Sequence, residues 1–97
     1  MRLLDFLYFQ SLLVDFFSAH YSVTQYTINR EYVHNQKVTY ININILFRND
    51  SKKLCVLVFP DSMNGSKEYI NTVFYLLRSD IKSFIKQTQS RQSWRKK

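Results

Sequence analysis

The sequence predicts a small α+β domain with an N-terminal helix, a three-stranded antiparallel meander and a long C-terminal amphipathic helix with a basic tail. Three observations support this prediction. Apolar residues recur every three to four positions near both ends of the chain and alternate with polar residues in the middle. Short runs rich in Asn, Asp and Ser separate the central segments, as turns do. A chain of 97 residues, 45% of them hydrophobic, can bury one core but not two.

Residues 3–19 form the predicted first helix. Its polar strip, Ser11, Asp15 and Ser18, is narrow, so we expect cover on most of its circumference by the sheet and by the last helix or a second copy of the chain. The acids Asp5 and Asp15 interrupt a run that is shorter than the ~20 residues of a membrane span, which favours a core helix over a signal or an anchor. The expected apolar face consists of Leu3, Phe6, Phe9, Leu13, Val14, Phe16 and Phe17.

The middle of the chain is predicted to form three strands, because β-branched and aromatic residues take over there. In the second strand every other residue is apolar, and Asn42 and Asn44 mark its solvent-facing side. The third strand is apolar on both faces, which predicts that it is covered on both faces or lies centrally. Pro60 ends it, since proline cannot donate to a ladder. The three strands are expected at 22–33, 37–47 and 54–59.

The last third of the chain, residues 66–97, is predicted to be one long helix that runs into a basic end. Ser66 is a candidate N-cap, and Glu68 lies near the positive end of the helix. We expect a single domain over residues 1–89 and a basic, flexible tail over residues 90–97. The expected apolar face of this helix consists of Ile70, Val73, Phe74, Leu77, Ile81, Phe84 and Ile85.

The positive charge is concentrated in the same segment. The formal net charge is +7, and residues 66–97 hold eight of the 14 Lys and Arg residues but only two of the seven acids. A one-sided positive field attracts polyanions: nucleic acid, an anionic membrane surface or an acidic protein surface.

A second row of side chains on the last helix, here named the basic stripe, consists of Lys67, Arg78, Lys82 and Lys86. The last three are four residues apart, so they follow one another at about 6 Å along the helix axis, which suits a row of phosphates. Such a face can equally be a merely solvated one. Tyr75 and Trp94 are placed to stack on a base. The full set of candidate nucleic-acid-binding residues is Lys67, Tyr75, Arg78, Lys82, Lys86, Arg91, Trp94, Arg95, Lys96 and Lys97.

No motif in the sequence points to an enzyme. His20 and His34 have no partner at metal-ligand or catalytic spacing, no two carboxylates pair, and one glycine is too few for a phosphate loop. We therefore expect no catalytic activity, no metal and no cofactor. Cys55 is the single cysteine, which favours a reducing, intracellular and most simply cytoplasmic location.

The order helix, three strands, helix, with Gly65, Ser66 and Lys67 opening the last helix, resembles the layout of a double-stranded-RNA-binding domain over most of the chain. In that family the last helix begins Ser-Lys-Lys-x-Ala-Lys, and its lysines grip phosphates across a groove. Here Glu68 and Asn71 replace the second and third lysines, and a large residue replaces the alanine. The resemblance therefore implies the layout and not the phosphate grip.

The expected function is that of a small non-enzymatic module that binds nucleic acid, RNA or DNA, mainly through phosphates. The alternative is an accessory protein of the viral or mobile-element type that docks on an acidic partner protein. A membrane-surface protein, held by the apolar N-terminal residues and the basic tail, is a third reading. A homodimer through the helix over 3–19 is compatible with the first two. The outer face of the sheet, with Tyr40, Asn42 and Asn44, is a second candidate surface for single-stranded RNA.

Overall fold

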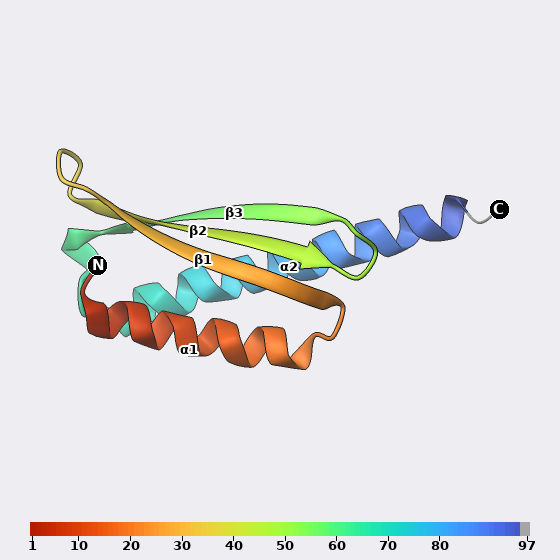
Figure 1. Cartoon of the computed structure of the whole chain (residues 1–97). Coiled ribbons are helices and arrows are strands. Elements are labelled where there is room, and N and C mark those ends of the chain that lie inside the picture. The colour runs from red at the N-terminus through yellow and green to blue at the C-terminus, as the bar shows by residue number, and fades with distance from the viewer. Residues whose placement is uncertain (96–97) are drawn as a thin grey trace.

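The computed structural model describes residues 1–95 and, of these, the side chains of residues 1–88. Figure 1 shows two layers, a three-stranded sheet and two helices side by side on one of its faces. The predicted order of helix, three-stranded antiparallel sheet and helix is confirmed. In chain order the elements are α1 (Leu3–Ala19), β1 (Val23–Val33), β2 (Val38–Phe47), β3 (Lys52–Pro60), the short 3₁₀ helix η1 (Asp61–Met63) and α2 (Lys67–Arg95).

The sheet is a meander with the strand order β1-β2-β3, so β2 lies at its centre. The register places Ile43 of β2 opposite Cys55 of β3. Successive side chains of a strand point to opposite faces, and Ile41, Ile43 and Ile45 all point to the helices and are buried. Asn44 points to the other face and is exposed, as the sequence predicts.

The third strand differs from its prediction. β3 begins at Lys52, two residues before the predicted start, and it is an edge strand rather than a central or doubly covered one. Its outer-face side chains Leu54, Val56 and Val58 are 58%, 54% and 40% exposed. An apolar run on both faces indicates a covered strand only when other elements lie on both faces. In the described part of the chain, helices cover only one face of the sheet.

α1 has the predicted bounds, and most of its predicted apolar face is buried, but two of the expected residues are exposed. Phe9 and Leu13 are fully buried, whereas Leu3 and Val14, which were expected in the core, are 60% and 42% exposed. Asp5 is buried in their place. The reason is that the sequence of α1 is apolar around most of its circumference, so its pattern alone does not define which side meets the sheet.

α2 begins with the predicted cap. The Ser66 Oγ accepts the backbone N–H of Tyr69 at 3.2 Å, which satisfies one of the unpaired donors at the helix start. Ile70, Leu77 and Ile81 are buried against the sheet and α1. The core thus lies between one face of the sheet and the two helices.

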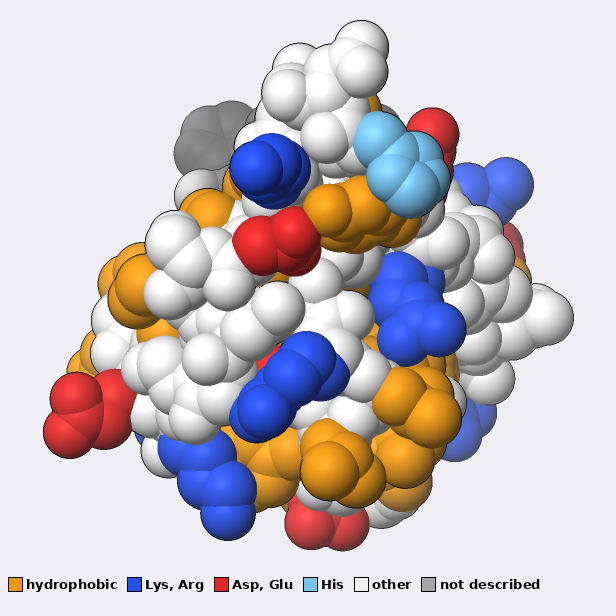
Figure 2. All heavy atoms as spheres, turned by 90° about the vertical axis from the view of Figure 1, so that its left-hand side faces the viewer, with side chains coloured by type: hydrophobic (Ala, Val, Ile, Leu, Met, Phe, Trp, Pro, Cys, Tyr) orange, Lys and Arg blue, Asp and Glu red, His pale blue; other side chains and the backbone are white. Residues whose placement is uncertain are grey.

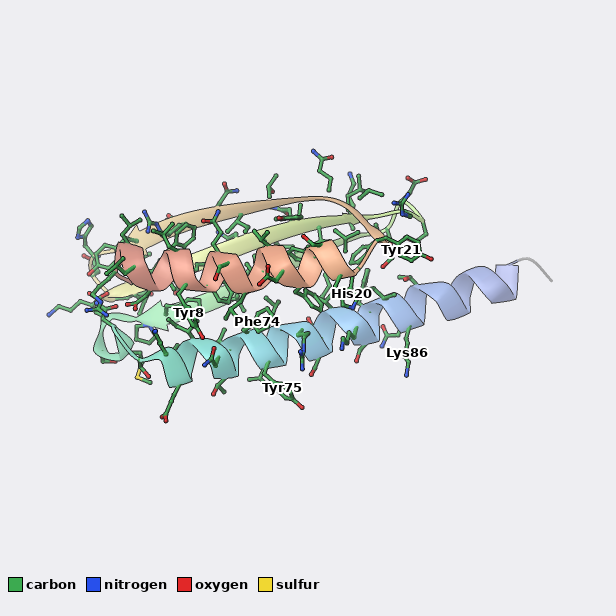
Figure 3. All side chains as sticks on the ribbon, turned by 90° about the horizontal axis from the view of Figure 1, so that it is seen from below. Tyr8, His20, Tyr21, Phe74, Tyr75 and Lys86 are labelled. Carbon is green, nitrogen blue, oxygen red and sulfur yellow. The ribbon has the colours of Figure 1, made fainter. Side chains whose placement is uncertain are left out.

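The two helices run side by side in the same direction, as Figure 3 shows. The Tyr8 hydroxyl donates to the Asn71 side-chain oxygen at 2.7 Å, and the Phe16 ring packs edge-on against Phe74 with ring centres 6.0 Å apart. α2 is the longer helix and projects beyond the end of the sheet (Figure 1). This projection positions the candidate site.

Candidate functional site

Three segments of the chain meet at the end of the sheet from which α2 projects (Figure 1). They are the turn after α1, the turn between β2 and β3, and the part of α2 around residues 82–88. Between them lies an open pocket of about 630 Å³, here named the turn pocket. The polar residues that carry its chemistry are His20, Tyr21, Arg48, Asn49, Lys82 and Lys86.

Backbone hydrogen bonds hold the two turns of the pocket together. The Arg48 N–H donates to the carbonyl oxygen of Ser22 at 2.9 Å, and the Val23 N–H donates to the carbonyl oxygen of His20 at 3.0 Å. Asp50 has a φ of 66°, a conformation that Asp tolerates in tight turns. The pocket is therefore positioned by short turns on the rigid sheet.

Three cationic side chains line the turn pocket. Lys82 and Lys86 are one helical turn apart on α2, and both are exposed. Arg48 comes from the β2–β3 turn, where its Nε donates to the Tyr21 carbonyl oxygen and its guanidinium lies 5.5 Å from the Tyr21 ring centre. The ion pairs among the described residues use other cations, and the described lining of the pocket contains no Asp or Glu. The pocket is therefore positively charged.

Two neutral side chains add hydrogen-bonding groups to the pocket. The His20 Nδ1 lies 2.9 Å from the Phe16 carbonyl oxygen, so Nδ1 carries a proton and donates to it, and Nε2 of the neutral ring is an acceptor. The Asn49 side-chain oxygen accepts the Ser51 N–H at 3.0 Å, which leaves the Asn49 amide hydrogens to donate elsewhere. The three cations together with the Asn49 amide donor form a site suited to an anion.

The residues of the basic stripe do not form one site, because they lie at different places along α2. Lys67 lies in the first turn of α2, with its Nζ 5.3 Å from an aromatic ring of α1 and about 28 Å along the helix from Lys86. Arg78 lies between them, half-buried, with its guanidinium 5.5 Å from the ring of the exposed Tyr75. Figure 3 shows Tyr75 pointing away from the molecule. Of the predicted residues whose side chains are described, Lys82 and Lys86 line the turn pocket.

Five predicted site residues lie at the C-terminal end. Arg91, Trp94 and Arg95 belong to α2, whose backbone includes residues 90–95 of the predicted tail, and their side chains are not among those described. Lys96 and Lys97 lie outside the described residues.

The opposite end of the molecule has a different arrangement of charge. Figure 2 shows its Lys and Arg side chains set apart, with acidic and hydrophobic side chains between them. The contacts there agree, because Arg2 pairs with Asp5 at 3.1 Å and the Arg30 guanidinium lies 4.6 Å from the Phe6 ring centre. This end does not resemble the turn pocket, so its cations serve as controls for it.

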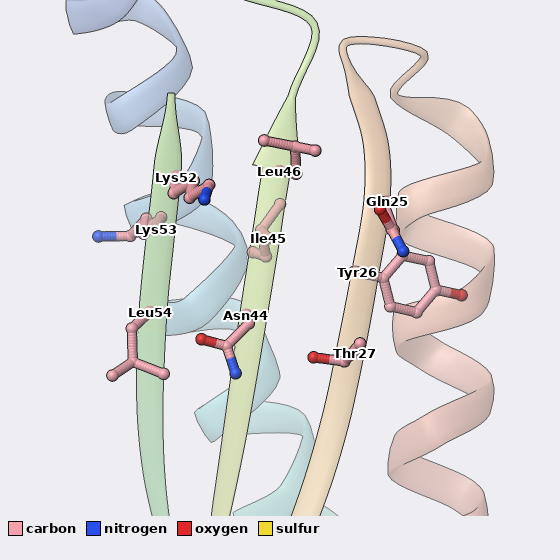
Figure 4. A pocket seen from close by; sticks show the side chains of 9 residues that line it. All are labelled: Gln25, Tyr26, Thr27, Asn44, Ile45, Leu46, Lys52, Lys53 and Leu54. Carbon is pink, nitrogen blue, oxygen red and sulfur yellow. The ribbon is translucent and has the colours of Figure 1, made fainter. Parts of the chain in front are cut away.

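The outer face of the sheet carries a shallow pocket of about 550 Å³ (Figure 4). Thr27, Asn44 and Leu54 form one row across its three strands. Tyr40, the aromatic residue expected on this face, uses its hydroxyl to donate to Gln36 at 2.8 Å. Sheets that bind single-stranded RNA stack bases on several aromatic rings, whereas the described outer face offers one. The turn pocket is the better candidate site.

The prediction from the sequence does not include Arg48, His20 or Asn49 as site residues. The pair at 48 and 49 is read there as turn chemistry, and His20 as a turn or surface residue. The predicted meander could have revealed part of the site. In three antiparallel strands, the turn before the first strand and the turn between the second and third strands lie at the same end of the sheet, which brings His20 close to Arg48 and Asn49. Which part of α2 reaches that end depends on how the helices pack.

No family model, curated protein or solved structure matches the chain. Among the described residues, no three His, Cys, Asp or Glu side chains are grouped in the way that holds a metal ion. In the described part of the chain, neither helix has the length and apolar character needed to cross a membrane. Because no known protein informs the function, the functional proposal rests on the chemistry of the turn pocket.

Proposed function

We propose that the protein binds nucleic acid through its phosphates, with the turn pocket as the principal contact and the basic stripe beside it. The observation that supports this most is the meeting of Arg48, Lys82 and Lys86, from two distant parts of the chain, in one pocket whose described lining contains no acidic residue. Cations held on a rigid framework bind phosphates by direct attraction and by releasing the counterions condensed on the nucleic acid.

The cations of the pocket have different roles in this proposal. Arg48, with its Nε held by Tyr21, keeps its terminal N–H groups for two oxygens of one phosphate, whereas the lysines act as point charges on neighbouring phosphates. The exposed Tyr21 ring beside Arg48 offers a flat surface on which an unpaired base can stack. Contacts of this kind give affinity with little sequence readout.

α2 extends the proposed interface in both directions from the pocket. Towards its start the helix carries Arg78 and Lys67 of the basic stripe, and towards its end it carries the basic residues 91–97. With six to eight phosphate contacts along α2, raising the salt concentration from 50 to 200 mM lowers the affinity by a factor of roughly 10³ to 10⁴. We further propose an intracellular location, because a single cysteine forms no internal disulfide. Burial raises the pKa of the Cys55 thiol, which fits a structural role for this residue.

One observation favours a second candidate function, that of an accessory protein that docks on another protein. The exposed side chains Leu54, Val56 and Val58 form an apolar row along β3, and Leu76 of α2 is exposed beside them. Apolar rows of this kind mark protein interfaces more often than nucleic-acid interfaces. This surface lies on β3, away from the lining of the turn pocket, so both functions can be present in one molecule.

Fluorescence anisotropy with labelled single-stranded and double-stranded DNA and RNA tests the proposal. The variant Lys82→Gln/Lys86→Gln removes two charges from the turn pocket, and Arg30→Gln/Lys37→Gln removes the same number from elsewhere on the surface. We expect at least a tenfold loss of affinity for the first variant, since each lost phosphate contact costs on the order of 1 kcal/mol, and a much smaller loss for the second. Absence of binding at low salt would refute the proposal. Equal displacement by polyglutamate would favour the acidic protein partner.

A further inference from the structure

We infer that β3 is a self-pairing edge, along which two copies of the chain join antiparallel to form one continuous sheet of six strands, three from each copy. The inference rests on the backbone and side chains of β3 and does not depend on the proposed function. The occupant of the edge is the β3 strand of a second copy, related to the first by a two-fold axis.

Three hydrogen bonds establish which backbone groups of β3 face the free edge. The Phe47 N–H donates to the Ser51 carbonyl oxygen at 2.9 Å, and the Asp61 N–H donates to the Lys37 carbonyl oxygen at 2.9 Å, which sets the phase of the ladder at both ends. In an antiparallel ladder every second residue turns both its N–H and its C=O to the partner strand. The groups of residues 54, 56 and 58 therefore point away from β2.

A contact on the free edge agrees with this phase. The Tyr69 hydroxyl donates to the Val58 carbonyl oxygen at 2.8 Å, which it can reach because that oxygen faces away from β2. An edge with unpaired backbone groups is a template for another strand. A carbonyl oxygen has two lone pairs, so Tyr69 and an incoming N–H can share it.

The side chains of the free-edge residues are apolar and exposed. Leu54, Val56 and Val58 have no charge among them, and the features that usually protect an edge, Pro60 and the exposed Lys52, stand only at the ends of β3. The outer face of β1, the other edge strand, carries exposed polar side chains throughout, from Gln25 to Glu31. Polar side chains therefore protect the β1 edge of the sheet against pairing, whereas the β3 edge lacks such protection along its middle.

The sequence of β3 is complementary to itself when it is reversed. A two-fold axis at Val56, the middle residue of the nine-residue strand, places Val56 against Val56 of the second copy and Leu54 against Val58. This register forms roughly six central backbone hydrogen bonds. It also separates the two Lys52 residues by about 26 Å, so like charges do not oppose each other across the joint.

The helix layer provides a second contact below the strand. Between β3 and α2 lies a shallow groove of about 490 Å³, bordered on α2 by Val73 and Leu76. Leu76 is 62% exposed on the rim of this groove. Pairing along β3 brings the α2 helix of the second copy towards this rim, where Leu76 gains a partner. The cations of the turn pocket line neither the groove nor the β3 edge.

Sedimentation equilibrium across a wide range of protein concentration, without nucleic acid, measures the joint. We expect the wild type to reach twice its 11.7 kDa, and Val56→Lys to raise the dissociation constant at least about tenfold, because it places two ammonium groups across the axis. Asn44→Lys, on the same face of the central strand, and Leu7→Lys, on the exposed side of α1, are the matched controls and should leave the dimer intact.

Backbone amide exchange gives a readout that does not depend on a variant. The amides of Leu54, Val56 and Val58 face away from β2, so they exchange fast in the monomer and should become protected as the dimer forms. A wild type that stays monomeric at every concentration would overturn the inference. So would a dimer in which these amides stay unprotected, or one that Leu7→Lys dissolves and Val56→Lys does not, which would place the joint on α1.

Discussion

The carboxylate of Asp5 joins the beginning of α1 to the beginning of α2. One of its oxygens accepts the Arg2 side chain at 3.1 Å and the Gly65 N–H at 2.9 Å. Gly65 has a φ of 81°, a conformation that favours glycine, and this turns its N–H to the carboxylate. The hydrogen bond from Arg2, helped by Gly65, holds the pKa of Asp5 below its ordinary value of 3.8 although burial opposes this.

We expect Asp5→Ala to lower the free energy of unfolding by about 1–3 kcal/mol near neutral pH, because it removes hydrogen bonds to a charged group. Since the folded pKa is the lower one, this stabilisation is complete above pH 3.8 and is lost as the pH falls through the folded pKa. Urea denaturation at neutral pH and well below pH 3.8 measures both effects. Asp15→Ala, an exposed residue of the same helix, is the control. A difference from wild type that stays constant with pH would contradict the account.

The N-cap of α2 has a matched control within the same helix. Ser66→Ala should lower the free energy of unfolding by about 1 kcal/mol, because the Tyr69 N–H loses its acceptor. Ser79→Ala, at an exposed position in the middle of α2, should be neutral or slightly stabilising, since alanine has the higher helix propensity. Thermal unfolding followed by circular dichroism compares the two. If both substitutions have the same effect, Ser66 does not act as a cap.

The orientation of α1 makes a prediction that opposes the sequence pattern. Leu13→Ala should cost about 2–5 kcal/mol of stability, because it opens a cavity in the core, whereas Val14→Lys should stay within about 0.5 kcal/mol of the wild type. The two residues are neighbours in the chain, so local propensity differs little between the sites. Urea denaturation of both variants measures the difference. A strongly destabilised Val14→Lys would mean that Val14 is covered, by the fold or by a second copy of the chain.

The elements were predictable where one local rule determines them. The bounds of α1, the alternation in β2 and the cap at Ser66 follow from periodicity, pleat and side-chain chemistry over a few residues. The exposure of Leu3 and Leu54 was not predictable, because an apolar residue does not say whether another element covers it. That depends on which side of a helix meets the sheet and on which strand lies at the edge.

The sequence predicted the part of the candidate site on α2 but not the part in the β2–β3 turn. Lys82 and Lys86 are four residues apart, so their spacing in the sequence predicts that they lie side by side on one helix face. Arg48 joins them from a turn more than 30 residues earlier in the chain, and only the packing of α2 against the sheet decides which lysines it meets. Lys67 and Lys86 share the basic stripe, but the length of α2 places them at different ends of the domain.

At the scale of the whole molecule, the described residues form three surfaces of different chemistry. The turn pocket and the basic stripe are cationic, the β3 edge is apolar, and the remaining outer face of the sheet is polar. Self-pairing along β3 places the turn pockets of the two copies at opposite ends of the joined sheet. Such a dimer would hold two phosphate sites facing away from its axis, and its affinity for a long nucleic acid would exceed that of one site by avidity.

The salt dependence of nucleic-acid binding tests the central claim most directly. The slope of the logarithm of the association constant against the logarithm of the salt concentration counts the phosphate contacts. For Lys82→Gln/Lys86→Gln we predict a slope smaller in magnitude than that of the wild type by about 2, and for Arg30→Gln/Lys37→Gln a slope close to that of the wild type. Equal reductions for the two variants would contradict the account, because the net charge of the protein, and not the turn pocket, would then bind the phosphates.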